Sequence, residues 1–332
     1  MKIENLETQL TALRIPVFKL PWPEAISPYA AATEEKMLAW GEQYGLFLND
    51  TYRERVKRTR YAYLAARCYP NASPDLLQVI ADYFLWFFMA DDLFVDRVET
   101  LNTETLQHLT AMIDVLDLQR SRPAPVYGEL AWLDVCQRLR QLLSAEHFER
   151  FAQGMRLWAT TAALQILNHL GSRSSQMTTY ETIRRHTSGM NPCVALVDVA
   201  NAGAVSPEIY YSADIQQLCL YVNNMVCWSN DIQSVPVEAR QPGQFRNMVL
   251  IHAEEGRTLQ EGVNYTANRI YEEIAKFIIL SEELYPDAST TMASFMDGCK
   301  YWMKGYIDWV MQDTLRYATQ FAAKDADDRK NL

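Results

Sequence analysis

The segment Ser73–Asp96 constrains the fold of this chain more than any other. It opens with Ser73-Pro74-Asp75, a helix start signal made of a capping serine, a proline at the first helical position and an acid in the first turn. From Tyr83 to Ala90 the sequence is then continuously apolar and rich in aromatic residues. A helix this apolar has no face suited to water. Most of the predicted helices are likewise too apolar for a surface bundle, so several of them should lie at the centre of the fold.

Helical signals dominate the rest of the 332 residues. Glycine (12) and proline (13) are sparse, and strand-like alternation is hard to find. Ser206-Pro207-Glu208 repeats the start signal before a helix expected over 213–233. Pro21–Pro28 and Gln241–Phe245 are expected as loops. Further helices are predicted over 33–47, 50–67, 104–118, 128–143, 146–170, 178–187, 259–283 and 288–319. The prediction is one all-α domain over 1–332, a helical bundle with an N-terminal segment (1–30) and a mobile tail (320–332).

Composition excludes several classes of function. A net charge of −10 argues against nucleic acid or an anionic membrane as the main partner. The longest apolar run, Tyr83–Ala90, is far shorter than the roughly 20 residues that cross a bilayer, so no stable membrane insertion is expected. The six cysteines and five histidines are scattered without a C-x-x-C pair, which argues against a zinc cage and predicts reduced thiols. The first residues lack a signal-peptide pattern, so a cytoplasmic protein is expected.

Three carboxylates end the apolar segment: Asp91, Asp92 and Asp96. Asp92 and Asp96 are i,i+4 neighbours and would stack on one helix face. Like charges this close repel one another, so the cluster needs cations, and oxygen ligands favour magnesium, manganese or calcium. The alternative is an acidic helix end in water. An aromatic run directly before the acids favours the metal-binding interpretation.

A second oxygen-rich cluster follows about 140 residues later, at Asn230, Ser234 and Glu238. Its amide, hydroxyl and carboxylate recur at i, i+4 and i+8, which drift by only about 80° around a helix. One face therefore presents all three oxygens, a set able to chelate one hard cation while leaving positions for water or phosphate. The alternative is a polar helix face with an incidental acid, which the presence of the first cluster disfavours.

The two clusters together resemble class I terpene synthases of the bacterial single-domain type. That family carries D-D-x-x-(x)-D and then N-D-x-x-S-x-x-x-E, here Asp91-Asp92-Leu93-Phe94-Val95-Asp96 and Asn230-Asp231-Ile232-Gln233-Ser234-Val235-Pro236-Val237-Glu238. Arg184, 46 residues before the asparagine, resembles the family's pyrophosphate sensor, and Arg316-Tyr317 resembles its terminal Arg-Tyr pair. The Pro21–Trp40 region is also similar, so the resemblance covers nearly the whole chain.

The resemblance implies the isoprenoid synthase fold with a central active-site cavity. It implies ionisation of a linear prenyl diphosphate and cyclisation to a terpene hydrocarbon or alcohol. Farnesyl diphosphate is the expected substrate, with geranylgeranyl and geranyl diphosphate left open. Three Mg²⁺ ions are implied, with Mn²⁺ as a substitute: two at the aspartate motif and one at the Asn-Ser-Glu triad.

Family resemblance also assigns the diphosphate contacts, which are Arg184, Asn230, Arg316 and Tyr317. It places a helix break at Thr187-Ser188-Gly189, which would relay diphosphate binding to the hydrocarbon chain. The alternative for Arg184 is an ordinary salt bridge to nearby Glu181.

A carbocation needs a dry, apolar pocket, and aromatic faces can stabilise its charge. Phe88 is the best candidate for the pocket wall, one turn before the acids. Ser188 and Gly189 are also candidates. Taken singly, each aromatic is expected as ordinary core more often than as pocket lining. The remaining aromatic candidates are Phe84, Phe87, Trp302, Tyr306 and Trp309, the last three recurring with Asp313 at i, i+4, i+7 and i+11.

Two residues depart from the family pattern. Val237 stands where a lysine or arginine commonly contacts the diphosphate. Pro236 lies within the second motif, where a helix interior would exclude it at a cost of about 3 kcal/mol. We therefore expect a local kink or unwinding that displaces Glu238 from its i+8 position.

Two other functions remain open. A chain-elongating prenyltransferase shares the fold and metal chemistry, although it would carry a second aspartate-rich motif in place of the Asn-Ser-Glu triad. A non-catalytic helical binding protein could also retain the motifs. The sequence leaves open whether the chain forms a homodimer.

Overall fold

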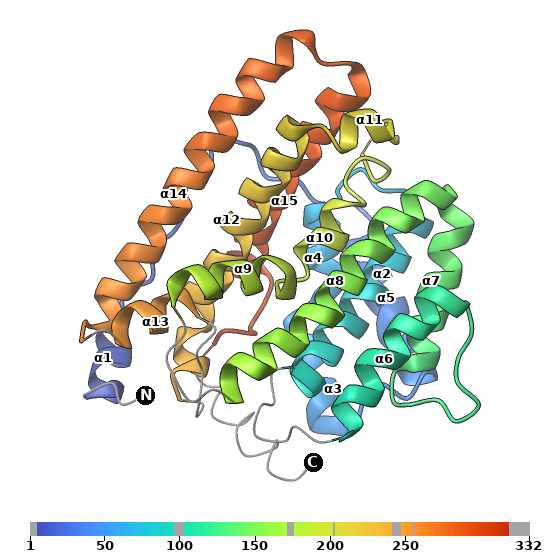
Figure 1. Cartoon of the computed structure of the whole chain (residues 1–332), viewed down its shortest axis with the longest axis horizontal. Helices are drawn as coiled ribbons and strands as arrows, with labels where there is room; N and C mark the ends of the chain where they lie inside the picture. Colours follow the sequence, from blue (N-terminus) through green and yellow to red (C-terminus); the bar gives the residue numbers. More distant parts are fainter. Residues whose placement is uncertain are drawn as a thin grey trace.

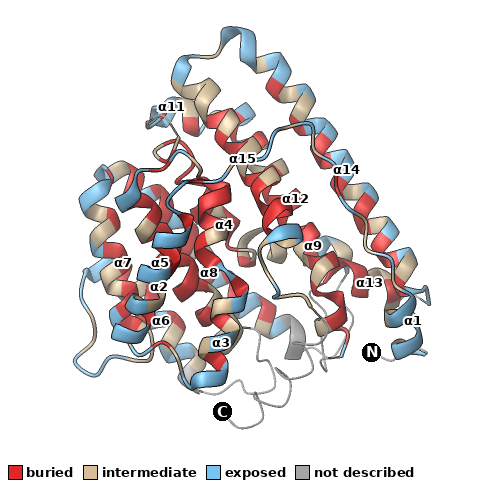
Figure 2. Ribbon diagram, turned by 180° about the vertical axis from the view of Figure 1, so that it is seen from behind, coloured by how far each residue is buried: buried red, intermediate tan, exposed pale blue. Residues whose placement is uncertain are grey.

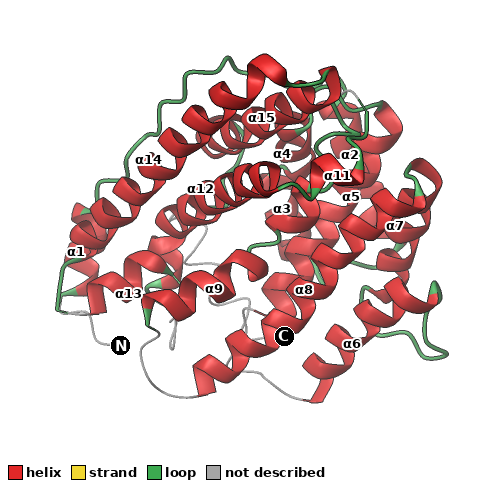
Figure 3. Ribbon diagram, turned by 45° about the horizontal axis from the view of Figure 1, so that its top comes forward, coloured by secondary structure: helices red, strands yellow, loops and turns green. Residues whose placement is uncertain are grey.

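The computed structural model describes residues 5–95, 103–170, 176–201, 203–240, 247–254 and 256–318. Within these ranges the chain is helical, with loops between helices and no strand (Figure 3), which confirms the predicted all-α class. The α-helices are α1 (Leu6–Ala12), α2 (Ala30–Gln43), α3 (Asp50–Thr59), α4 (Tyr61–Cys68), α5 (Pro74–Ala90), α6 (Thr103–Leu118), α7 (Glu129–Leu142), α8 (Ala145–Leu170), α9 (Met177–Thr187), α10 (Met190–Val194), α11 (Pro207–Tyr210), α12 (Ala213–Glu238), α13 (Met248–Glu254), α14 (Leu259–Leu284) and α15 (Thr290–Gln312). A π-helical turn, η1 (Asp91–Val95), and a 3₁₀ turn, η3 (Tyr285–Asp287), complete the set.

The apolar helix α5 lies at the centre, where the sequence predicts several helices. It is buried along nearly its whole length, and α2, α4 and α7 pack against it. Helix α4 also packs on α15, while α12 packs on both α14 and α15 (Figure 1). Buried residues face the interior, and exposed residues cover the outer faces of α7 and α14 (Figure 2). The buried side chains form one connected hydrophobic core.

Predicted start signals cap the helices they precede. Ser73 Oγ accepts a hydrogen bond from Leu76 N at 3.3 Å, and Pro74 is the first residue of α5. Ser206 likewise caps α11, accepting from Ile209 N. However, the start signal at Ser206 begins this separate four-residue helix, and α12 begins later, at Ala213.

The predicted helix 50–67 is two helices. The chain breaks at Arg60, whose φ of 59° ends α3 and starts α4. Trp309 Nε1 donates to the carbonyl oxygens of Thr59 (3.1 Å) and Arg60 (3.0 Å). The Arg60 carbonyl also accepts from Tyr63 N (3.1 Å) and Leu64 N (3.2 Å), so the indole adds a tertiary contact that ties α15 to both sides of the break.

The predicted helix 288–319 ends at Gln312. Arg316 and Tyr317 therefore lie on a non-helical segment that turns back over the bundle, and Leu315 N donates to the carbonyl of Arg58 at 3.0 Å.

The expected unwinding at Pro236 is wrong, whereas the alternative of a local kink stays a prediction. Helix α12 runs through Pro236 to Glu238 without interruption of its helical assignment. Loop 21–28 is non-helical as predicted, whereas 241–245 and the tail 320–332 lie outside the described residues. Among the residues that the structure describes, no helix has the length and hydropathy to cross a membrane.

Candidate active site

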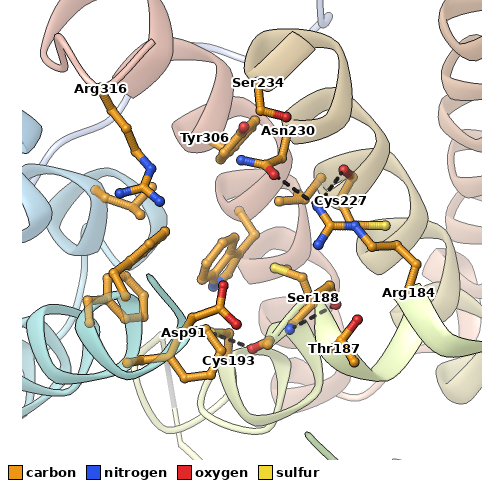
Figure 4. Close-up of a pocket in the computed structure, with 18 of the residues that line it drawn as sticks. Asp91, Arg184, Thr187, Ser188, Cys193, Cys227, Asn230, Ser234, Tyr306 and Arg316 are labelled. Carbon is orange, nitrogen blue, oxygen red and sulfur yellow. Dashed lines mark hydrogen bonds between the residues drawn. The ribbon is translucent and has the colours of Figure 1, made fainter. Parts of the chain in front are cut away.

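A cavity opens between α5, the α9–α10 junction, α12 and α15, and it collects most of the predicted site residues (Figure 4). Its predicted polar lining consists of Asp91, Arg184, Ser188, Asn230, Ser234, Glu238, Arg316 and Tyr317. The predicted aromatic residues that line it are Phe84, Phe87, Phe88, Trp302 and Tyr306. Gly189, from the predicted helix break, lines it as well. Residues from helices more than 200 positions apart in sequence therefore share one cavity.

Arg184 points from the last turn of α9 towards α12 (Figure 4). Its Nη2 donates to Asn230 Oδ1 at 2.9 Å and pairs with Asp231 Oδ1 at 2.9 Å. Burial lowers the pKa of Arg184, but the Asp231 carboxylate raises it, and the resulting pKa lies well above the ordinary value. The alternative salt bridge to Glu181 is wrong, because Glu181 pairs with Arg269.

Asn230 joins two of the predicted diphosphate contacts. Its Oδ1 accepts from Arg184, and its Nδ2 donates to Tyr317 Oη at 2.7 Å. Tyr317 Oη in turn lies 3.4 Å from Tyr306 Oη. A single polar chain thus runs from α9 across α12 to the segment after α15.

Asp91 and Asp92 point in different directions. Asp91 lines the cavity, whereas Asp92 is held by arginines: Arg316 Nη2 at 2.9 Å and Arg55 Nη2 at 3.1 Å. Burial lowers the pKa of Arg316, but Asp92 raises it, and the resulting pKa is well above the ordinary value. The Arg316 guanidinium also lies 5.0 Å from the centre of the Phe88 ring. Asp92 therefore sets the position of an arginine that borders the cavity.

The α12 wall is braced from behind by Asn247, which sequence reasoning missed. Asn247 is fully buried, and its Nδ2 donates to Glu238 Oε2 at 2.9 Å and Ser234 Oγ at 3.3 Å. Both oxygens therefore lie within reach of one nitrogen, and Glu238 lines the same cavity as Asn230 despite Pro236. The second motif ends at Glu238, nine residues before Asn247, so no motif pointed to this residue.

Behind the same wall, Asp231 is buried and fully engaged. It accepts hydrogen bonds from Met248 N (2.8 Å) and from the Tyr180 hydroxyl, and it pairs with Arg184. Burial raises the pKa of Asp231 to about 6 against the opposing effect of Arg184. Asp231 thus orients the arginine rather than facing the cavity.

The donor set fits a hard divalent cation. An amide oxygen, a hydroxyl and a carboxylate from one face of α12 line the cavity, and oxygen ligands suit magnesium. Within the described ranges no three His, Cys, Asp or Glu side chains cluster tightly enough to hold a metal. The Asn230, Ser234 and Glu238 triad would not form such a cluster, because only Glu238 is one of these four residue types. The aspartate motif is incomplete in this respect, because Asp96 lies outside the described residues.

The predicted helix break lies between α9 and α10. Gly189 has a φ of 73°, a left-handed conformation that favours glycine. A Cβ at this position would lie 2.3 Å from Phe87 Cζ, so the close approach of α5 also requires glycine. The break therefore brings main chain directly against the cavity.

Most of the predicted aromatics line the cavity, but Trp309 does not. Its indole is fully buried and donates to the carbonyls of Thr59 and Arg60 at the α3–α4 break. Trp302 and Phe84 meet edge to face with ring centres 6.0 Å apart. Sequence reasoning assigned no cavity role to several further lining residues: Leu64, Gln165, Met190, Cys193, Val226 and Cys227.

Comparisons with known proteins agree with this geometry. The profile of the family described as "Terpene synthase family 2, C-terminal metal binding" matches residues 82–276. The chain is 60% identical over 329 residues to a protein named "Sesquiterpene synthase" from Metarhizium brunneum (strain ARSEF 3297), covering 99% of this chain and 96% of the relative. It is 56% identical over 314 residues to a Kitasatospora setae protein named "(+)-corvol ether B synthase/(+)-corvol ether A synthase ((2E,6E)-farnesyl diphosphate cyclizing)", covering 95% and 98%.

The fold is also found among solved structures. The linalool/nerolidol synthase from Streptomyces clavuligerus superposes with a TM-score of 0.79 at 20% identity, covering 88% of this chain and 99% of that chain. The arrangement of helices described above is therefore the isoprenoid synthase fold.

Proposed function

Because this chain belongs to the terpene synthase family and is a terpene cyclase, we propose that it ionises farnesyl diphosphate and cyclises the cation to a sesquiterpene hydrocarbon or alcohol. Farnesyl diphosphate is favoured by the name of the relative from Kitasatospora setae, which is 56% identical.

The observation that carries the proposal is the division of one cavity into two ends. Arg184, Asn230, Arg316 and Tyr317 gather at one end, where cationic and hydroxyl groups suit a diphosphate. Aromatic and aliphatic side chains line much of the same cavity: Leu64, Phe84, Phe87, Phe88, Met190, Val226 and Trp302. Such a cavity can hold an anionic head and an apolar tail at the same time.

The residues present fit divalent ions, and we assign Mg²⁺, with three ions in total. Asp91 and Asp96, which lies outside the described residues, would hold two of them. Asp92, which the sequence also assigned to this metal site, would act through its pairing with Arg316 instead. The triad Asn230, Ser234 and Glu238 would hold the third. When bound, the ions would supply the positive charge that stabilises a departing diphosphate.

The chain's own residues would perform the remaining tasks. Arg184 and Arg316 bind and orient the diphosphate, and Tyr317 adds a hydroxyl contact. Phe88 and Trp302 exclude water from the cation, which water would otherwise quench early. Their ring faces stabilise passing positive charge.

The test is incubation of the purified protein with geranyl, farnesyl and geranylgeranyl diphosphate, with and without Mg²⁺, followed by mass spectrometry of the extract. We expect a cyclic fifteen-carbon product from farnesyl diphosphate that disappears with a chelator and returns with Mg²⁺. Mn²⁺ should substitute.

Two outcomes would replace the proposal. A longer prenyl diphosphate formed from dimethylallyl and isopentenyl diphosphate would identify a chain-elongating prenyltransferase. Absence of diphosphate release from every substrate would identify a non-catalytic binding protein. Size-exclusion chromatography with light scattering would decide whether a homodimer forms.

A further inference from the structure

A buried asparagine outside the cavity ties the α9–α10 break to α12. Asn223 is 2% exposed, and its Nδ2 donates to the carbonyl of Arg185 at 2.8 Å and to Asn191 Oδ1 at 3.0 Å. Its Oδ1 accepts from Ser188 Oγ at 3.1 Å. Both amide hydrogens and one lone pair therefore serve residues on the two sides of Gly189.

These bonds hold the break from behind. Ser188 and Gly189 line the cavity, whereas Arg185, Asn191 and Asn223 do not. Ser188 Oγ also accepts from Met190 N at 3.2 Å, which extends the network into α10. Asn223 thus fixes the position of a cavity wall that it does not itself form.

The face of α12 that carries Asn223 also carries Asn230, one of the proposed diphosphate contacts. Asn223, Cys227 and Asn230 recur at i, i+4 and i+7, so they share one helix face. Arg184 bonds to two of them, donating to the carbonyl of Cys227 at 3.4 Å and to Asn230 Oδ1. The end of α9 is therefore attached to α12 at two neighbouring points, the side chain of Arg184 and the main chain of Arg185.

We propose that Asn223 is a positioning residue for cyclisation: it keeps the cavity-facing break in register with the diphosphate contacts, and so selects the product. The inference rests on the proposed function. Without Asn223 the break can shift relative to Arg184, and a misplacement of about 1 Å can reduce a rate about 100-fold.

The chain offers a matched control. Asn224 is the next residue of α12, but its Nδ2 donates away from the break, to Glu273 Oε2 of α14 at 2.8 Å. Asn223→Ala, Asn191→Ala and Asn224→Ala should each be assayed with farnesyl diphosphate and Mg²⁺, with product ratios, kcat, KM and thermal midpoints measured.

We expect Asn223→Ala to raise the proportion of side products and to lower kcat about 10- to 100-fold, with KM changed less than about threefold. Asn191→Ala removes its bond to Asn223 and its 3.0 Å bond to His186 Nδ1 but leaves the other two bonds of Asn223, so it should shift the product ratio in the same direction by less. Asn224→Ala should leave the ratio unchanged. If Asn223→Ala does not fold, Asn191→Ala carries the test.

Unchanged product ratios in Asn223→Ala and Asn191→Ala, with only a lower thermal midpoint, would overturn the inference and leave a structural role. The same shift in Asn224→Ala would overturn it as well. Failure of the proposed function is distinguishable, because the wild-type enzyme would then form no cyclic product at all.

Discussion

The two oxygen-rich walls of the cavity have similar chemistry but different construction. The aspartate wall lies where α5 gives way to the π-helical turn η1, and Asp92 is already paired with Arg316 and Arg55. The opposite wall lies inside α12, where Asn247 braces Ser234 and Glu238 from behind.

The difference shows when the spacing of a motif predicts the directions of its side chains. Inside a regular helix, i, i+4 and i+8 translate directly into one face, even across a proline. A π-helical turn widens the repeat, so stacking inferred from α-helical spacing no longer follows. Adjacent residues of a helix also point in different directions, about 100° apart in an α-helix, so Asp91 can line the cavity while Asp92 pairs with an arginine.

The largest effect is expected from Asn230→Ala on the α12 wall. The change removes a proposed metal ligand and the bridge between Arg184 and Tyr317, so diphosphate release should fall at least about 1,000-fold. The assay is steady-state diphosphate release, with circular dichroism to verify helical content. Asn224→Ala is the control, and activity within tenfold of wild type would remove Asn230 from the site.

The aspartate wall should respond unequally to matched substitutions. Asp91→Asn should reduce kcat about 100-fold or more and raise the Mg²⁺ concentration needed for half-maximal activity. Asp92→Asn should act mainly through Arg316, raising KM for the diphosphate about 10-fold with a smaller change in Mg²⁺ dependence. Titrations of Mg²⁺ and substrate on both variants separate the two roles. Identical profiles would contradict the divergence seen in the structure.

Asn247→Leu tests the brace behind the α12 wall. Loss of the bonds to Ser234 and Glu238 should raise the Mg²⁺ concentration for half-maximal activity about 10- to 100-fold, because supporting residues orient metal ligands. The substitution also removes the bonds of Asn247 to Val249 N, Leu250 N and the Asp231 carbonyl, so the thermal midpoint is measured in parallel. Excess Mg²⁺ should recover most of kcat. If Mg²⁺ dependence stays as in the wild type, the two ligands hold their positions without the brace.

The smallest effect is expected from Pro236→Ala. An alanine restores the main-chain donor to the Ile232 carbonyl, so the free energy of unfolding in urea should rise by about 1 kcal/mol. Activity should stay within about twofold, because α12 already carries Glu238 to the cavity through the proline. A large loss of activity would show that Pro236 sets the position of Glu238.

Local signals explain what the sequence predicted correctly. The cap at Ser73, the apolar run of α5 and the helical spacing of the second motif depend on residues close in the chain. They therefore predicted the helix α5 and the face of α12. The helix break that the family resemblance implied at Thr187-Ser188-Gly189 is also present, between the end of α9 and the start of α10.

Tertiary contacts explain what the sequence left out. Trp309 shares a helix face with Trp302, but periodicity gives the face and not the point at which the cavity ends along α15. The indole instead completes the α3–α4 break. Asn247 and the pairing of Asp92 with Arg55 join segments with no local relation, and no spacing rule could have found them.

The contact between Gly189 and Phe87 has an evolutionary consequence. A methyl group at 189 would overlap the Phe87 ring, and a φ of 73° independently disfavours any other residue there. A lineage can therefore enlarge the cavity here only by shortening residue 87. Among related enzymes, residue 87 should therefore vary while Gly189 stays glycine. Differences in product that arise at this contact would come from residue 87 alone.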